Sequence, residues 1–191
     1  MKRIIIGITG LARSGKDTAA KFLVEEKNFQ QISFAWALKR ACAAMYGIDL
    51  TKFDLGDRLG ADPFWQMTYR EILQKVGTDL VTNHLDPDFW VKRVAYQVSK
   101  MDDMKVPVVI SDVRFENEAT WVRQQGGIII RIVRHDSGLP DELGRHVSES
   151  GIAHNNKDFI VENNSTVEDL YTNIDAIYDF AKFNAEAADG Q

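Results

Sequence analysis

Residues 10–16 contain two glycines and a lysine at a spacing that suits the binding of a polyphosphate. The segment reads G-L-A-R-S-G-K, so that four residues separate Gly10 from Gly15 and Lys16 follows directly. Glycines permit a tight turn close to an anion, and the backbone N–H groups at a helix start point at negative charge. The lysine reaches the outer phosphate oxygens. The position between an apolar run and a helical pattern predicts a phosphate-binding loop, against the alternative of a glycine-rich connection without a ligand.

The residue after the lysine departs from the usual form of this motif. A Ser or Thr there would hold magnesium through its hydroxyl group. Here Asp17 occupies the position and the hydroxyl comes one residue later, at Thr18. Both side chains are therefore candidate magnesium ligands, either directly or through water.

A second chemical cluster follows another apolar run, in the segment S-D-V-R-F-E-N-E. Ligands bind beyond the carboxyl ends of strands in parallel sheets, so Asp112 is expected at the same edge as Lys16 and as a third candidate for magnesium. Arg114 suits a bidentate grip on phosphate. Glu118 orients Arg114 or accepts hydrogen bonds from a base or sugar. The alternatives are that Asp112 caps the next helix, and that Glu118 forms an exposed pair worth ~0.3–0.5 kcal/mol.

A third set of polar residues recurs every four positions along a predicted amphipathic helix. Arg70, Gln74 and Thr78 share a face beside the apolar one, where a solvated stripe is the alternative to a binding surface. Gly77 costs a helix interior ~1 kcal/mol relative to alanine, so we expect close approach of another group or a bend there. Trp90 either packs in the core, which is the default for tryptophan, or stacks on a nucleobase.

Alternating apolar runs and helical patterns must position these residues, and they predict an α/β fold with a central, mainly parallel five-stranded sheet. Strands are expected at 4–9, 30–34, 106–110, 128–133 and 159–161, and helices at 15–26, 37–45, 68–83, 87–101, 116–125 and 167–183. Residues 47–66 are interpreted as a loop-rich insertion and 134–150 as a polar loop over the active site. The tail at 184–191 is expected to fray.

Composition favours one soluble domain that spans residues 1–191. Hydrophobic residues make up 45% and charged residues 27%, with a net charge of −5. This acidic balance disfavours a nucleic-acid polymer as partner. Cys42 is the single cysteine, which suits a buried thiol in a reducing cytoplasm. The first apolar run is interrupted by Gly7 and continues into Arg13, so a signal peptide is rejected, and no segment approaches the ~20 apolar residues of a membrane span.

Several segments together resemble one family. G-L-A-R-S-G-K-D-T, R-E-I-L-Q-K-V-G-T-D-L, F-W-V-K and S-D-V-R-F-E-N-E, in this order, and H-V-S-E-S-G-I at 146–152 are similar to segments of the bacteriophage deoxynucleoside monophosphate kinases. The resemblance runs from residue 1 to about 175 and is poor over 47–66. It departs at Glu71, where some members have a basic residue beside the arginine.

The resemblance implies a three-layer α/β/α fold of the P-loop NTPase type, with an acceptor-binding helical insertion at about 36–104 and a short lid at about 134–150. It implies ATP with Mg²⁺ as the donor and a deoxynucleoside monophosphate as the acceptor. It also implies a homodimer, and a host cytoplasm if the chain is phage-encoded. Neither a nucleic-acid polymer nor a membrane is expected as a partner.

The resemblance also assigns residues by position. The implied ATP-binding residues are Arg13, Ser14, Gly15, Lys16, Asp17 and Thr18. The implied acceptor-binding residues are Arg70, Gln74, Gly77, Thr78, Trp90, Arg114 and Glu118. Catalysis is assigned to Lys16, Asp17, Asp112 and Arg114, and the candidates for the lid are Arg131, Arg134 and His146.

The predicted reaction is transfer of the ATP γ-phosphoryl group to the acceptor phosphate. An anionic phosphate oxygen needs no strong general base, so positioning and charge neutralisation are expected to supply catalysis. Phosphomevalonate kinase of the animal type, with an S-G-K-D loop and an S-D-x-R segment, and dephospho-CoA kinase remain alternatives on the same fold. A nucleotide-dependent switch is an alternative from another class, but the pair Arg70 and Arg114 indicates a second phosphate site that a switch does not need.

Overall fold

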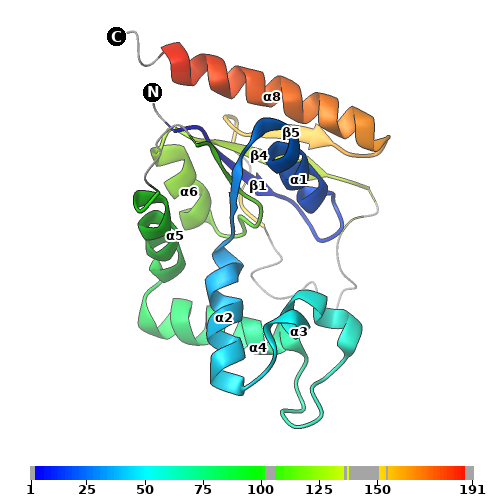
Figure 1. Cartoon of the computed structure of the whole chain (residues 1–191), viewed down its shortest axis with the longest axis vertical. Coiled ribbons are helices and arrows are strands. Elements are labelled where there is room, and N and C mark those ends of the chain that lie inside the picture. The colour runs from blue at the N-terminus through cyan, green and yellow to red at the C-terminus, as the bar shows by residue number, and fades with distance from the viewer. Residues whose placement is uncertain (1–2, 102–105, 136, 138–150, 154, 188–191) are drawn as a thin grey trace. The chain divides into compact units, whose positions relative to one another are not determined.

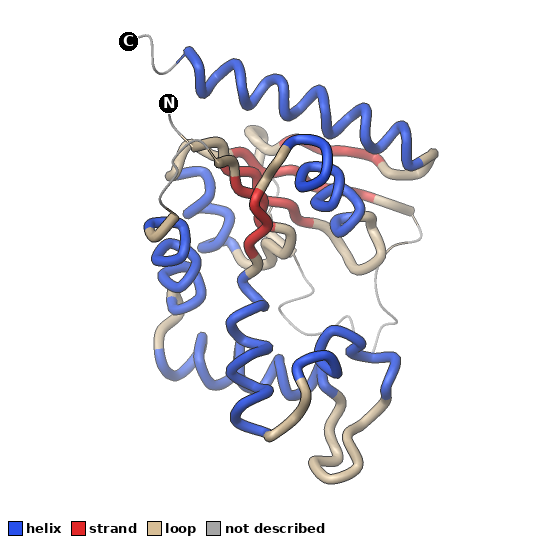
Figure 2. The backbone as a smooth tube through the Cα atoms, viewed as in Figure 1, coloured by secondary structure: helices blue, strands red, loops and turns tan. Residues whose placement is uncertain are grey.

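The computed structural model describes residues 3–101, 106–135, 137, 151–153 and 155–187. The chain divides into two compact units. The sheet unit consists of Met1–Ile32 and Tyr96–Gln191, and the helical unit consists of Ser33–Ala95 (Figure 2). The helical unit overlaps the insertion predicted at 36–104.

A five-stranded parallel sheet forms the centre of the sheet unit, in the order β2-β3-β1-β4-β5. The strands are β1 (Ile5–Thr9), β2 (Gln30–Ile32), β3 (Val108–Ile110), β4 (Ile128–Val133) and β5 (Phe159–Glu162). β1 and β3 are buried along their whole length, which explains their continuous apolar sequences. The predicted parallel α/β sheet is confirmed.

Helices cover both faces of this sheet (Figure 1). α1 (Lys16–Lys27) and α8 (Val167–Ala187) pack on one face, where Ile6 and Ile8 of β1 join Leu23 of α1 and Ile174 of α8 in the core. α6 (Glu116–Gln124) packs on the other face. There a Cβ added to Gly7 would lie 2.6 Å from Ile129 Cδ1 and 3.4 Å from Val122 Cγ2, so a glycine lets this helix approach the sheet.

The helical unit has its own small core. Its elements are α2 (Phe34–Tyr46), α3 (Leu50–Leu55), the 3₁₀-helix η1 (Gly56–Leu59), α4 (Tyr69–Gln74), the π-helix η2 (Lys75–Leu85) and the first part of α5 (Phe89–Ser99). The core residues are Cys42, Ile48, Phe53, Tyr69, Ile72 and Val76. Cys42 is buried as predicted, and desolvation raises the pKa of its thiol to about 11.

The interpretation of 47–66 as loop-rich is wrong, because α3 and η1 lie within it. Asp49 caps α3: its carboxylate accepts hydrogen bonds from the backbone N–H of Thr51 at 2.8 Å and from the hydroxyl of Thr51 at 2.6 Å. The helix then buries Phe53 against the ring of Tyr69. The expected fraying from 184 is also wrong in part, since α8 continues to Ala187.

None of the helices in the described ranges combines the length and the apolar character that crossing a bilayer requires.

Candidate active site

The predicted phosphate-binding loop begins where β1 ends. Gly10 follows the buried Thr9 and has a φ of 147°, a value that strongly favours glycine. A Cβ at Gly10 would overlap the backbone carbonyl of Ile132 and lie 2.8 Å from Ser14 Oγ. The first glycine of the motif is therefore required both by its backbone conformation and by the approach of β4.

The loop turns tightly before it enters α1. The backbone N–H of Ser14 donates to the carbonyl of Leu11 at 3.2 Å, and Arg13 has a φ of 65°. Ser14 is fully buried, and its hydroxyl is without a hydrogen-bond partner among the described residues. Gly15, with a φ of 106°, precedes the first residue of α1 and gives that helix no side-chain cap. The N–H groups at this helix start thus suit an anion.

Lys16 lies in the first turn of α1 beside the loop. Its ammonium group donates to the carbonyl of Leu11 at 2.7 Å, which folds the side chain over the loop. Lys16 and Thr18 are half-buried, whereas Asp17 is exposed. The predicted donor-side residues therefore gather in one short segment between β1 and α1.

Asp112 lies at the same edge of the sheet as the loop. β1 and β3 are parallel with Gly7 opposite Ile110, so Asp112, in the turn directly after β3, and the loop after Thr9 leave the sheet at the same edge. The N–H of Val113 donates to the carbonyl of Ile8 at 3.1 Å, so the turn after β3 stays bonded to the end of β1, one residue out of the register of the strands. The register thus places the predicted acid next to the start of the loop, where it is half-buried.

Glu118 fixes the backbone that presents Arg114. One of its carboxyl oxygens accepts from the N–H of Arg114 at 2.7 Å and from the N–H of Phe115 at 3.0 Å. Glu118 is 4% exposed, so the alternative of an exposed ion pair is wrong. Its carboxyl group caps the start of α6, and the Arg114 side chain is exposed.

Burial raises the pKa of Glu118 to about 8, and the negative charge of Asp112 adds to this increase. The two backbone N–H groups and the guanidinium of Arg114 oppose it. Desolvation is the largest effect because the carboxyl group is almost wholly enclosed. The group therefore holds its proton at neutral pH.

Four of the predicted acceptor-side residues, Arg70, Gln74, Gly77 and Thr78, lie on α4 and η2 of the helical unit. Thr68 and Glu71 form a capping box at the start of α4: the N–H of Glu71 donates to the hydroxyl of Thr68 at 3.1 Å, and the N–H of Thr68 donates to the carboxylate of Glu71 at 2.7 Å. Glu71 at this position thus has a structural role. Arg70 and Gln74 are half-buried and Thr78 is buried, so they differ from a fully solvated stripe.

The helix predicted over 68–83 changes type at Lys75, where η2 begins. The close approach expected at Gly77 is confirmed, since a Cβ there would lie 2.5 Å from Leu38 Cδ2 of α2. The carbonyl of Gly77 accepts from the hydroxyl of Thr82 at 2.9 Å and from the indole N–H of Trp90 at 3.0 Å. Thr82 and Trp90 thus donate to a carbonyl that, in a regular α-helix, would accept a hydrogen bond from the helix backbone. Trp90 has this structural contact, and its role with the acceptor stays a prediction.

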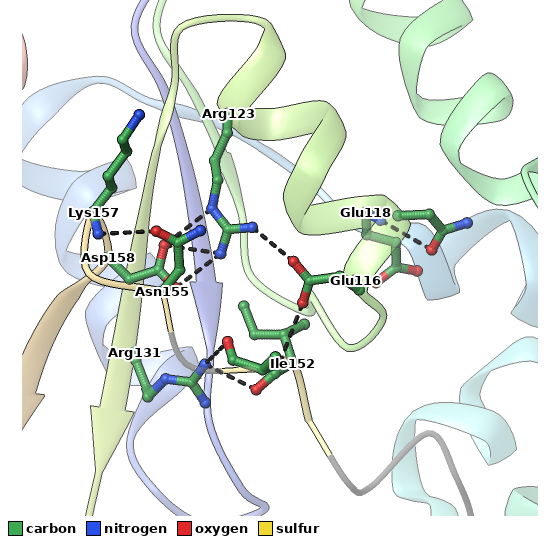
Figure 3. Close-up of polar contacts among 10 residues, drawn as sticks. Glu116, Glu118, Arg123, Arg131, Ile152, Asn155, Lys157 and Asp158 are labelled. Atoms are coloured by element: carbon green, nitrogen blue, oxygen red, sulfur yellow. Dashed lines mark hydrogen bonds and ion pairs between the residues drawn. The ribbon is translucent and has the colours of Figure 1, made fainter.

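Arg131, the first candidate for the lid, is a strand residue. It lies on β4 opposite Thr9 of β1, and one of its terminal nitrogens donates to the carbonyls of Ile152 and Ala153, both at 2.9 Å (Figure 3). Arg134 is exposed after β4. His146 and most of the predicted lid lie outside the described residues, so these assignments stay predictions.

Two sets of structural side chains were not predicted. Arg123 of α6 donates to both carboxyl oxygens of Asp158 at 2.9 Å and to Glu116 at 2.9 Å (Figure 3). Glu116 in turn accepts from the N–H of Ala153 at 3.2 Å. Asn163, after β5, donates to the loop carbonyl of Ser14 at 2.8 Å. Except for Arg123 and Glu116, which share α6, these partners lie far apart in the sequence, and no local pattern indicates them.

Magnesium is compatible with the oxygen donors on this edge. Among the described residues, three or more His, Cys, Asp or Glu side chains do not gather in any one place. Mg²⁺ at a nucleotide site needs only one or two carboxylates, because water and phosphate oxygens complete its coordination. Asp17, Thr18 and Asp112 supply ligands of this chemical type.

Comparisons with known proteins point to one family. A family model for deoxynucleotide monophosphate kinases matches residues 61–174. A protein of Acanthamoeba polyphaga mimivirus, provisionally named as such a kinase, is 34% identical over 93% of this chain and 97% of its own length. The deoxynucleotide monophosphate kinase of Enterobacteria phage T4 is 28% identical over 57% of this chain and 44% of its own.

Solved structures show the fold. A gluconokinase from Sinorhizobium meliloti has a TM-score of 0.53 at 13% identity, with 96% of this chain and 99% of that chain covered. Dephospho-CoA kinase from Campylobacter jejuni has a TM-score of 0.50 at 17% identity, with 94% and 98% covered. The P-loop kinase fold is thereby confirmed, and from the family model and the mimivirus relative the chain belongs to the deoxynucleotide monophosphate kinase family.

Proposed function

We propose that this chain transfers the γ-phosphoryl group of ATP to a deoxynucleoside monophosphate, giving ADP and a deoxynucleoside diphosphate. The observation that supports this most is the loop Gly10–Gly15 with the uncapped start of α1, in a chain of this family. The names of the mimivirus and T4 relatives point to the same acceptor.

The donor phosphates are proposed to lie on the loop. The N–H groups of the loop and of the first turn of α1 would bind the phosphate oxygens. Lys16 would leave the carbonyl of Leu11, which it contacts at 2.7 Å, and neutralise the outer phosphates. Asp17, Thr18 and Asp112 would hold Mg²⁺ directly or through water. When bound, this ion neutralises charge on the phosphate oxygens.

The acceptor is proposed to bind through the helical unit, with Arg70 on its phosphate and with Gln74 and Thr78 as further polar contacts. Arg114 would stabilise the transferring group, since a guanidinium can grip two phosphate oxygens. Glu118 acts on this step through the backbone N–H of Arg114, which it binds at 2.7 Å. No strong base is needed, because the attacking phosphate oxygen is already an anion.

The described residues also bear on the partners and the compartment of the protein. Small nucleotides are the proposed partners, and the buried thiol of Cys42 suits a reducing compartment such as the cytoplasm.

The main test is an assay of ADP release with ATP and each deoxy- and ribonucleoside monophosphate in turn. Dephospho-CoA and phosphomevalonate serve as alternative acceptors. We expect ADP release that depends on a deoxynucleoside monophosphate. ADP release with dephospho-CoA or phosphomevalonate alone would reassign the acceptor. Binding of ATP without ADP release for any acceptor would instead indicate a switch.

Matched variants test the two proposed cationic groups. Lys16→Ala should abolish transfer, whereas Lys21→Ala removes an exposed lysine of the same helix that pairs only at its surface with Glu25, at 3.6 Å. Arg114→Ala should lower turnover by orders of magnitude in a folded protein, because the side chain is exposed. Arg40→Ala, at an exposed position of α2, is its control. Near-normal turnover of the Arg114 variant would remove Arg114 from the catalytic residues.

A further inference from the structure

The turn between β5 and α8 holds the phosphate-binding loop from the side. The backbone N–H of Asn163 donates to the carbonyl of Val133 at 2.8 Å and so continues the pairing of β5 with β4. The side-chain amide of Asn163 donates to the carbonyl of Ser14, also at 2.8 Å. A residue fixed by the central sheet therefore binds the loop backbone 149 positions away in the sequence.

This hydrogen bond fixes the direction of one peptide group. The peptide between Ser14 and Gly15 is trans, as are all peptides described, so its C=O and N–H point in opposite directions. Since the carbonyl of Ser14 points to Asn163, the N–H of Gly15 points away from Asn163. Without the bond, this peptide would rotate easily, because glycine accepts many backbone conformations.

Gly15 and the side chain of Asn163 are also closely packed. A Cβ at Gly15 would overlap the side-chain nitrogen of Asn163 and lie 3.7 Å from Leu170 Cδ2 of α8. The amide of Asn163 thus occupies the room that the missing side chain leaves. The second glycine of the motif is required by this contact as well as by its φ of 106°.

We propose that Asn163 is a positioning residue for the donor phosphates: it holds the Ser14–Gly15 peptide so that the Gly15 N–H is presented to a phosphate oxygen. The proposal rests on the proposed binding of ATP by this loop. Loss of one such neutral hydrogen bond is expected to weaken binding roughly three- to tenfold. Because the effect acts through the phosphates, it should be independent of the nucleobase.

The test compares two ligands, ATP and inorganic tripolyphosphate, in the full-length protein by calorimetry. Asn163→Ala should raise the Kd of both ligands by the same factor, raise the KM for ATP, and leave the KM for the acceptor unchanged. Asn164→Ala is the control, since the side chain of Asn164 accepts from the N–H of His135 at 2.9 Å instead. A weaker affinity for ATP with an unchanged affinity for tripolyphosphate would overturn the proposal, because Asn163 would then contact the base or sugar.

A second pair of variants covers the case in which Asn163→Ala does not fold. Asn163→Asp keeps the shape but places an acceptor against the carbonyl of Ser14, and Asn164→Asp adds the same charge one residue away. We expect a larger loss of tripolyphosphate affinity for Asn163→Asp than for Asn164→Asp, and equal losses would overturn the proposal. If the wild type binds neither ligand, the proposed function itself fails, whereas unchanged variants of an active wild type refute the role of Asn163 alone.

Discussion

Replacement of Glu118 by glutamine tests whether a buried, protonated carboxyl group supports the corner at Arg114. Glutamine keeps the shape of the side chain, and its carbonyl oxygen accepts the same two hydrogen bonds from the N–H groups of Arg114 and Phe115. Its amide cannot ionise in the range where Glu118 does. The two proteins should therefore differ in how their stability depends on pH.

The direction of this difference follows from the pKa of Glu118, which burial raises from 4.5 to about 8. Below pH 4.5 both the folded and the unfolded chain hold the proton, so the favourable contribution is complete. Between pH 4.5 and about 8 the unfolded chain has lost the proton and the folded chain keeps it. The free energy of unfolding of the wild type therefore falls by ~1.4 kcal/mol per pH unit across this window, relative to the variant.

At pH 7 this difference amounts to roughly 3 kcal/mol in favour of Glu118→Gln. For a chain of this length, 1 kcal/mol shifts the Tm by roughly 2–4 °C, so the effect is readily measured. Urea unfolding at one-unit steps from pH 5 to pH 9, without nucleotide or magnesium, gives the free energy for each protein. Glu162→Gln removes an exposed carboxyl group of β5 and should follow the wild type.

Parallel stability curves for wild type and Glu118→Gln would refute this reasoning. They would mean that the two N–H donors and the charge of Arg114 keep Glu118 ionised despite its burial. A variant that is less stable at every pH would show that glutamine cannot replace the hydrogen bonds.

The remaining predictions concern packing, an ion pair and the magnesium ligands. Gly77→Ala should destabilise the chain by up to roughly 2 kcal/mol, because the clash of the new methyl group with Leu38 at 2.5 Å outweighs the ~1 kcal/mol by which a helix favours alanine; in urea unfolding, the loss for the double variant with Leu38→Ala should be smaller than the sum of the two single losses. Asp158→Ala should lower the free energy of unfolding by roughly 2–3 kcal/mol, because it removes the buried carboxylate, 1% exposed, that pairs with the guanidinium of Arg123. A Tm within 1 °C of that of the wild type would contradict this. Asp17→Ala should raise the Mg²⁺ concentration needed for half-maximal turnover, because alanine supplies no oxygen ligand, and an unchanged Mg²⁺ dependence would exclude Asp17 as a ligand.

Local patterns predicted the sheet and the loop because these features are encoded by neighbours in the sequence. The apolar run before Gly10 indicates a buried strand. The ends of every predicted strand lie within two residues of the observed ends. The start of α8 is likewise set by neighbours, since the N–H of Asp169 donates to the hydroxyl of Thr166 at 3.1 Å. In these cases the signal and the structure lie within a few residues of each other.

The helical unit was harder to predict because contacts override its local pattern. Apolar spacing favours one regular helix through Gly77, but the packing of Leu38 and the hydrogen bonds from Thr82 and Trp90 make the second half a π-helix. In the region predicted as a loop, the many glycines obscured the cap at Asp49 and the buried Phe53 that define α3.

The residues of the candidate site divide in the same way. Those with an assigned chemistry, such as Lys16 and Asp112, belong to short motifs, since a phosphate-binding loop and the acid after a strand are each made by one strand end. Residues that hold such groups in place come from any part of the chain. Asn163 is an unremarkable residue of a turn in the sequence, and its relation to Ser14 exists only because β5 is parallel to β4 and ends beside the loop. A search confined to motifs therefore finds a positioning residue such as Glu118 only when it belongs to the motif itself, and it misses one such as Asn163 that lies elsewhere in the chain.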